Sequence, residues 1–417
     1  MQEELSQSLA TEHLSTLILI ASIAAVSGVL LGYETGVISG AILYINDEFI
    51  LSPWGNHFVI HSIIVGAFLG CLVSGRLADC WGRRWLLILA ALIFLIGTVG
   101  SFLATSSASL IMSRTILGIA IGISSFTAPL YIAEIAPAKS RGLLVSFNQL
   151  AITIGIVMAY ILDAYYAKQG GQWRWMLGLG VVPAMVLFIG MLFVPNSPEW
   201  AAHRKKNHVN WRELFQPFGH SALIVGIGLA FFQQCTGINT IIYFAPTVFE
   251  MAGFQSHTVA MLATFGIGIA NIIFTLLFLL LIDRLGRRPL LLVGLLGMTL
   301  GLSGLSIAFY LGVHSSQLKW IAFGGMMIYI ASFAMSLGPI MWLMIAEIFP
   351  FNVRGLGTSL AAASCWGFNI IVTLLFLNIF QLLGPSGIFL AYAVLCVIGF
   401  LFAAAYVPET CGIDLPG

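Results

Sequence analysis

The feature that most constrains this chain is a set of charged, glycine-containing motifs that occurs twice, each time between long apolar segments. The first copy covers residues 75–84, 134–142 and 195–199, and the second covers 283–288, 347–355 and 408–410. Matching motifs are separated by a nearly constant number of residues. A repeat of this length indicates that one unit of six apolar segments has been duplicated. The chain is therefore predicted to form two related halves.

Composition places both halves in a membrane. Hydrophobic residues make up 59% of the 417 residues and charged residues only 8%, with a mean hydropathy of +1.02. A water-soluble domain of this size could not bury so much apolar surface. Read as spans of about 20 residues, the apolar runs predict an all-α membrane protein with twelve transmembrane helices. These cover residues 16–44, 58–78, 85–105, 109–132, 142–165, 174–194, 221–251, 258–282, 289–312, 319–345, 355–381 and 387–407.

The basic residues predict the side of the membrane on which each connection lies. Thirteen of the 17 Lys and Arg fall in alternate connections, and connections rich in these residues are normally cytoplasmic. They are Arg76, Arg83, Arg84, Lys139, Arg141, Arg204, Lys205, Lys206, Arg212, Arg284, Arg287, Arg288 and Arg354. Both termini are therefore expected in the cytoplasm. With a net charge of +1, the chain is not expected to bind nucleic acid.

The repeat also predicts the domain boundaries. Residues 1–194 are expected to form one bundle of six helices and residues 221–417 a second. The polar segment 195–220 between them is too short for an independent domain. One or two amphipathic turns at 211–215 are expected to lie on the membrane surface.

The repeated charged motifs predict a network at the cytoplasmic ends of the helices. Gly82 and Gly286 allow the backbone to reverse, and Asp79 and Asp283 can pair with Arg or cap a helix. A carboxylate at one helix end and an Arg from a neighbouring helix can form a latch that breaks when the face opens. The expected members are Asp79, Arg83, Arg84, Glu134, Arg141, Asp283, Arg287, Arg288, Glu347 and Arg354. Alternatively, each Arg is simply a topology anchor.

Several of these segments resemble the sugar porters of the major facilitator superfamily, and most of all the bacterial proton-coupled pentose and hexose carriers. The resemblance rests on residues 32–40, the two Asp-Gly-Arg-Arg turns, and residues 129–134, 233–239, 338–342 and 408–410. It covers nearly the whole chain. It implies two six-helix bundles with inverted repeats within each half, a monomer in a cell membrane, and transport of a monosaccharide by alternating access.

Amide side chains in the predicted seventh helix are the candidate substrate contacts. Gln233, Gln234 and Asn239 lie in an otherwise apolar span, where an amide must face the bundle interior or a wet cavity. Amides donate and accept hydrogen bonds, as sugar hydroxyls do. Gln149 and Asn148 offer the same chemistry from the other half. Each amide taken alone is more typical of contacts between helices.

The resemblance assigns sugar contacts to a defined set of residues. They are Gln149, Gln233, Gln234, Asn239, Asn271, Trp342 and Trp366. The two Trp are expected to pack against the apolar face of the sugar and to donate an indole hydrogen bond. Two positions depart from the family pattern, because Cys365 replaces an amide and Leu31 replaces a frequent Phe. The pocket is therefore expected to have one fewer strong hydrogen-bond partner.

Glu34 is the candidate proton-binding residue. It lies within the first predicted span, and Arg114 of the fourth span is its expected partner. Proton-coupled relatives carry an acid at the position of Glu34, whereas passive relatives carry a neutral amide. Protonation of Glu34 would release Arg114 and shift the balance between the bundles. Alternatively, the two residues form a permanent structural pair in a facilitative sugar uniporter.

Other functional classes find little support in the sequence. His57 and His61 are four residues apart and could share a metal, but no third ligand lies nearby, so an interfacial position is expected. The chain lacks the hydrolase and phosphate-binding motifs of enzymes. It also lacks the long extensions typical of a sugar sensor that does not transport. No enzyme activity and no cofactor are predicted.

Overall fold

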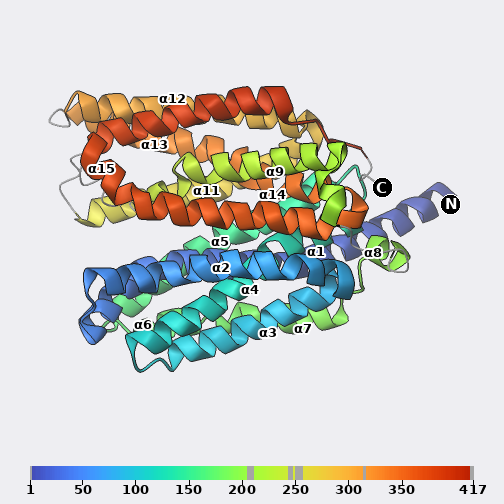
Figure 1. The fold of residues 1–417 in the computed structure, drawn as a ribbon, viewed down its shortest axis with the longest axis horizontal. Coiled ribbons are helices and arrows are strands. Elements are labelled where there is room, and N and C mark those ends of the chain that lie inside the picture. The colour runs from blue at the N-terminus through green and yellow to red at the C-terminus, as the bar shows by residue number, and fades with distance from the viewer. Residues whose placement is uncertain (1, 204–210, 243–247, 249–256, 313–315, 414–417) are drawn as a thin grey trace.

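The computed structural model describes residues 2–203, 211–242, 248, 257–312 and 316–413. In these residues the chain forms two bundles of long helices that lie side by side (Figure 1). The first bundle contains α1 (Gln2–Phe49), α2 (Pro53–Trp81), α3 (Arg83–Phe102), α4 (Ser107–Ile135), α5 (Arg141–Lys168), α6 (Trp173–Gly178) and α7 (Val181–Phe193). The second contains α9 (Pro217–Cys235), α11 (His257–Leu285), α12 (Arg287–Tyr310), α13 (Ser316–Ala334), α14 (Leu337–Glu347) and α15 (Arg354–Tyr406).

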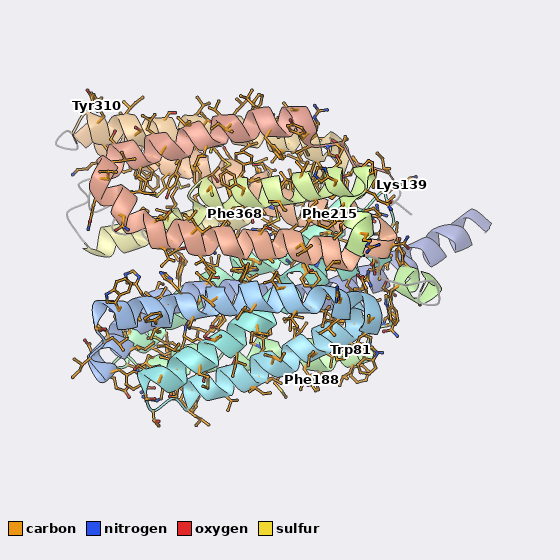
Figure 2. The ribbon with its side chains drawn as sticks, viewed as in Figure 1. Trp81, Lys139, Phe188, Phe215, Tyr310 and Phe368 are labelled. Carbon is orange, nitrogen blue, oxygen red and sulfur yellow. The ribbon has the colours of Figure 1, made fainter. Side chains whose placement is uncertain are left out.

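Twelve helices of the described residues are long and apolar enough to cross a membrane, which confirms the predicted number of spans. The outer flanks of both bundles carry mostly apolar side chains (Figure 2). Trp81 and Tyr310 lie at opposite ends of the molecule (Figure 2), and both are largely exposed. Aromatic side chains at both ends of an apolar band are typical of the two membrane interfaces. The protein is therefore an integral membrane protein that crosses the bilayer several times.

Four of the predicted spans differ in detail from the structure. The sixth is divided into α6 and α7, and the tenth into α13 and α14. The last two are joined as α15, in which the predicted connection is reduced to a kink at Gly384 (φ 67°, ψ 177°) followed by Pro385. Glycine reaches this positive φ without a steric penalty, so the chain can turn within one residue. The predicted seventh helix beyond residue 242 lies largely outside the described residues.

Short helices collect at one end of the molecule, which we call the α8 face. Here lie α8 (Pro198–His203), η1 (Trp211–Phe215) and η2 (Phe351–Val353), close to the beginning of α1 and the end of α15 (Figure 1). The turns at η1 were predicted from the sequence. Gly82 and Gly286 turn the chain between α2 and α3 and between α11 and α12, with φ of 92° and 91°. This matches the reversal expected at both glycines.

The two bundles meet along two pairs of helices. The first half of α15 packs against α2, and α11 packs against α5. The approach is close, because a Cβ atom on Gly75 of α2 would lie 2.0 Å from the Oγ of Ser359 in α15. Any side chain at Gly75 would force these helices apart. The contact between bundles therefore depends on this glycine at the α8 end of α2.

Candidate functional site

Two buried clusters of acids and arginines lie at the α8 face, one in each bundle. In the first, Arg83 pairs with Glu134 at 2.8 Å and with Asp79 at 3.2 Å. In the second, Arg287 pairs with Glu347 at 3.1 Å and with Asp283 at 2.9 Å. These are the contacts between helix ends that the repeated motifs predicted. Each cluster ties together the helices of a single bundle.

The aspartates of these clusters also reach across to the other bundle. Asp79 of α2 accepts hydrogen bonds from the backbone N–H groups of Gly355 and Leu356, both at 3.2 Å, where α15 begins. Asp283 of α11 accepts from the N–H groups of Gly142 and Leu143 at 3.1 and 2.7 Å, where α5 begins. A carboxylate is well placed at a helix N-terminus, where backbone N–H groups are free and the helix dipole is positive. Each bundle therefore caps a helix of the other.

The Arg-Gly pair that begins α5 and α15 makes this capping possible. A Cβ atom on Gly142 or on Gly355 would lie 2.3 Å from the facing aspartate oxygen. The preceding arginines add contacts between the bundles. Arg141 donates to the backbone carbonyl of Ile413 at 3.0 Å, and Arg354 pairs with Glu199 at 2.7 Å. These contacts join the two bundles at the α8 face.

Arg84 and Arg288 do not belong to this network, contrary to the sequence prediction. Arg84 donates to the backbone carbonyls of Met191 and Leu192 at 3.0 and 2.6 Å, and Arg288 donates to Ala404 at 2.6 Å. All of these carbonyls lie near the end of a helix in the same bundle as the arginine, where backbone acceptors are unpaired. Among the described residues, neither arginine pairs with a carboxylate. The second arginine of each Arg-Arg pair therefore closes a helix end within one bundle.

Two acids of the network carried no predicted role. Glu199 is the partner of Arg354 across the bundles. Glu409 accepts from the N–H groups of Arg287 and Arg288 at 3.0 and 3.1 Å, so it caps α12. Both belong to the repeated Pro-Glu motifs at 195–199 and 408–410. Their repetition was a signal, but the sequence alone did not reveal their partners.

A hydrogen-bonded group of polar side chains lies inside the second bundle. Gln233 donates to the backbone carbonyl of Gly338 at 3.0 Å, and Asn239 donates to Gln234 at 2.6 Å. Cys365 lies between the two glutamines, because it donates to Gln233 at 3.1 Å and accepts from Gln234 at 3.0 Å. These contacts bring Gln233, Gln234 and Asn239 together as predicted. The thiol of Cys365 completes the group, although a thiol bonds more weakly than an amide.

The other residues predicted to contact the sugar lie close to this group in the chain or on helices through which the two bundles contact each other. Trp342 is buried in α14, a short distance beyond Gly338. Trp366 follows Cys365 in α15, and its indole N–H donates to Ser125 of α4 at 3.3 Å. Gln149 is buried in α5, and Asn271 is buried in α11, the helix that packs against it. The side-chain oxygen of Asn271 has no hydrogen-bond partner among the described residues.

Glu34 and Arg114 face each other inside the first bundle, as predicted. Both side chains are almost completely buried, and Arg114 Nη1 lies 3.7 Å from Glu34 Oε2. This is an ion pair that is too long for a direct hydrogen bond. Arg114 is also held by the carbonyl of Val59 in α2, to which its Nε donates at 2.8 Å. The pair thus joins three helices, α1, α2 and α4.

The chain matches known proteins over nearly its whole length. The sequence pattern of the family described as "Sugar (and other) transporter" matches residues 20–208 and 201–416. A D-xylose transporter of Levilactobacillus brevis is 38% identical, with 93% of this chain and 91% of the relative covered.

Solved structures agree with this. The proton:xylose symporter XylE bound to 6-bromo-6-deoxy-D-glucose superposes with a TM-score of 0.86 at 31% identity, covering 96% of this chain and 98% of that one. The inward open conformation of XylE from E. coli has the same identity, covers 94% and 97% of the two chains, and reaches a TM-score of 0.72. The twelve helices thus have the major facilitator fold. The chain belongs to the sugar (and other) transporter family of the major facilitator superfamily.

Proposed function

We propose that this protein is a proton-coupled monosaccharide symporter that works by alternating access. The observation that carries the proposal is the buried pair of Glu34 and Arg114 in a chain of this family. An acid within a membrane span can bind a proton. Because a charge in a membrane costs free energy, such residues serve a function or pair with an opposite charge. The relatives that are named as xylose transporters or proton symporters support the same activity.

The contacts of the α8 face support the alternating step. Asp79 and Asp283 hold the two bundles together at this face. The TM-score is also higher against the sugar-bound XylE structure, 0.86, than against its inward open form, 0.72. We infer that the α8 face is cytoplasmic, in agreement with its basic residues, and that it is closed in this conformation. Transport requires these contacts to break so that the sugar and the proton leave on that side.

The polar group around Cys365 supports recognition of a sugar. Its amides are now bonded to one another, to Cys365 and to Gly338. A sugar can replace these bonds, because its hydroxyls both donate and accept. Trp342 lies one turn beyond Gly338 in α14 and Trp366 directly follows Cys365 in α15, so each adds an apolar face next to a member of this group in the chain. The class of substrate is therefore a pentose or a hexose.

We further propose the location and assembly of the protein. Its bundles correspond to residues 1–194 and 221–417, with the segment 195–220 as a cytoplasmic link. The membrane is the inner membrane of a bacterium, both termini lie in the cytoplasm, and a single chain performs transport.

Uptake into liposomes tests this function directly. Purified protein is reconstituted, a gradient acidic outside is imposed, and a panel of radiolabelled pentoses and hexoses is offered. At least one sugar is expected to accumulate above its external concentration, and an uncoupler is expected to abolish the accumulation. Uptake that only equilibrates would indicate a uniporter, and no uptake of any sugar would contradict the proposed substrate class.

Substitution of Gln234 or Asn239 by Ala is expected to weaken sugar binding. Loss of one hydrogen bond at a buried site removes about 1 to 3 kcal/mol, so affinity should fall by roughly 5- to 150-fold. Isothermal calorimetry on the detergent-solubilised variants measures the change. Gln169 is exposed at the end of α5, so Gln169→Ala is a matched control that should bind as the wild type does. Unchanged affinity in both site variants would remove these residues from the site.

A further inference from the structure

Trp366 belongs to two groups of residues at once. On one side it follows Cys365, whose thiol bonds to Gln233 and Gln234 in the proposed sugar site. On the other it lines a small cavity together with Glu34 and Arg114. A side chain that forms part of both sites can transmit a change in one of them to the other.

The cavity gives the proton-binding pair room to rearrange. Its volume is about 20 Å³, and its other walls are Thr35 and the isoleucines Ile38, Ile60, Ile63, Ile64 and Ile121. Protein interiors are close-packed, so a buried side chain can move only where space is left for it. Both carboxylate oxygens of Glu34 are buried and have no hydrogen-bond partner among the described residues. The carboxyl group is thus held by packing and by charge, and Trp366 is one of the residues that line the same cavity.

Ser125 anchors the indole of Trp366 to the helix that carries Arg114. The indole N–H donates to Ser125 Oγ at 3.3 Å, and the hydroxyl of Ser125 donates to the carbonyl of Gly122 at 3.0 Å. Arg114 and Ser125 are both buried in α4. Their separation corresponds to about three turns of helix, so they lie on nearly the same side of it. One helix of the first bundle therefore positions both the partner of Glu34 and a tryptophan of the second bundle.

We propose that Trp366, held by Ser125, is the element that couples sugar occupancy to protonation of Glu34. The inference rests on the proposed symport. A sugar that contacts the indole changes its position against Ser125 and the cavity wall. Protonation of Glu34 removes its negative charge and so weakens its attraction to Arg114. Both residues line the same cavity as the indole, so their rearrangement changes the surroundings of Trp366. Coupling between two sites is reciprocal, so each ligand alters the affinity for the other by the same factor.

Other titratable groups also lie on the helices around Glu34. His61 of α2 lies within electrostatic range of Arg114, and Asp163 of α5 accepts from the backbone of Gly40, further along α1. Tyr33 donates to the carbonyl of Met176 in α6. Among the residues that the structure describes, none of these groups lines the cavity that Trp366 shares with Glu34. A pH effect that requires Ser125 therefore points to Trp366 and Glu34.

The test compares Ser125→Ala with Ser124→Ala. Ser124 directly precedes Ser125 in α4 and is equally buried, and among the described residues its hydroxyl bonds only to the carbonyl of Ile121 in its own helix. Sugar affinity is measured by calorimetry at one acidic and one alkaline pH for each protein. In the wild type and in Ser124→Ala, the two affinities should differ by a coupling factor of roughly 5 to 150. In Ser125→Ala, the factor should fall below about half of the wild-type value, while sugar still binds.

A second variant tests whether loss of the indole hydrogen bond itself, and not another effect of replacing Ser125, reduces the coupling factor. Trp366→Phe keeps an aromatic ring but has no N–H to donate, so it should reduce the coupling factor as Ser125→Ala does. An unchanged factor in Ser125→Ala, with sugar bound normally, would overturn the inference and leave symport standing. A wild type that binds sugar equally at both pH values would also overturn it. Absence of sugar binding to the wild type would contradict the proposed function itself.

Discussion

Replacement of Glu34 by Gln is expected to abolish sugar accumulation driven by a proton gradient, whereas sugar binding and sugar exchange should persist. The variant keeps the shape of a protonated carboxyl group but cannot release a proton. Glu34 lies in the first bundle and the amide group in the second, and Trp366, which lines the same cavity as Glu34, follows Cys365 of that group. The sugar contacts should therefore remain, and only the coupling should be lost. Counterflow and gradient-driven uptake in liposomes distinguish the two activities.

The control uses the same substitution at the far end of the same helix. Glu48 of α1 forms a partly exposed ion pair with Arg174 at 2.7 Å, and such pairs contribute little to stability. Glu48→Gln should therefore leave accumulation unchanged. Glu34→Asp retains a titratable group and should keep part of the accumulation. Uphill uptake at the wild-type rate by a well-folded Glu34→Gln protein would make the pair with Arg114 structural and would favour a uniporter.

Stability must be measured before that result is interpreted. Removing one partner of a buried ion pair typically destabilises a protein by about 3 to 5 kcal/mol. In Glu34→Gln, Arg114 keeps its hydrogen bond to the carbonyl of Val59. The loss of stability should therefore be smaller than if Arg114 kept no hydrogen bond. A thermal unfolding curve in detergent measures the change. Only variants that remain folded at the assay temperature enter the transport comparison.

Sequence patterns predicted the parts of this protein that depend on local composition. Twelve apolar runs gave twelve spans, since a chain cannot expose polar backbone in a bilayer. Charged motifs at helix ends gave the pairs of Arg83 with Glu134 and of Arg287 with Glu347. A buried acid and a buried arginine in different spans gave Glu34 and Arg114. For the ion pairs, a buried charge without a partner costs much free energy, so few other pairings were possible.

Features that depend on how the bundles meet could not be predicted in this way. Two adjacent arginines look alike in the sequence, yet Arg83 enters a carboxylate cluster and Arg84 turns to backbone carbonyls of α7. Cys365 looked like a lost polar contact, but the fold places its thiol between two glutamines. The hydrogen bond from Trp366 to Ser125 crosses between the bundles. Such contacts follow from the relative position of helices, which hydrophobic patterns do not specify.

Removal of both capping aspartates is expected to shift the protein towards a conformation open at the α8 face. In Asp79→Ala with Asp283→Ala, the N-termini of α5 and α15 lose four hydrogen bonds to carboxylate oxygens. Each bond to a charged group contributes about 1.5 to 3 kcal/mol, and about 1.4 kcal/mol changes an equilibrium tenfold. Even partial replacement of these bonds by water should leave a large shift. The caps join different bundles, so their loss acts on the contact between the bundles.

Spin labels on the two bundles measure this shift. Arg76 in α2 and Arg284 in α11 are exposed near the α8 ends of helices in the two bundles, and cysteines placed there can carry the labels. Cys80 is exposed and Cys411 is partly exposed, so both are first replaced by Ser. Pulsed electron resonance should then show a longer distance between the labels in the double variant than in the parent protein. Transport should slow, because a carrier that rests in one conformation must return against the altered equilibrium.

Arg84→Ala and Arg288→Ala provide the decisive contrast. Each removes a cation of the repeated motif at the same face, but the lost contacts lie within one bundle. These variants should therefore lose some stability, yet their distance distributions should match that of the parent protein. If they lengthen the distance as much as the aspartate variant does, positive charge at this face controls the conformation. If only the aspartate variant does so, the closed state depends on each bundle capping a helix of the other, and the duplicated Asp and Arg-Gly motifs form one reciprocal gate.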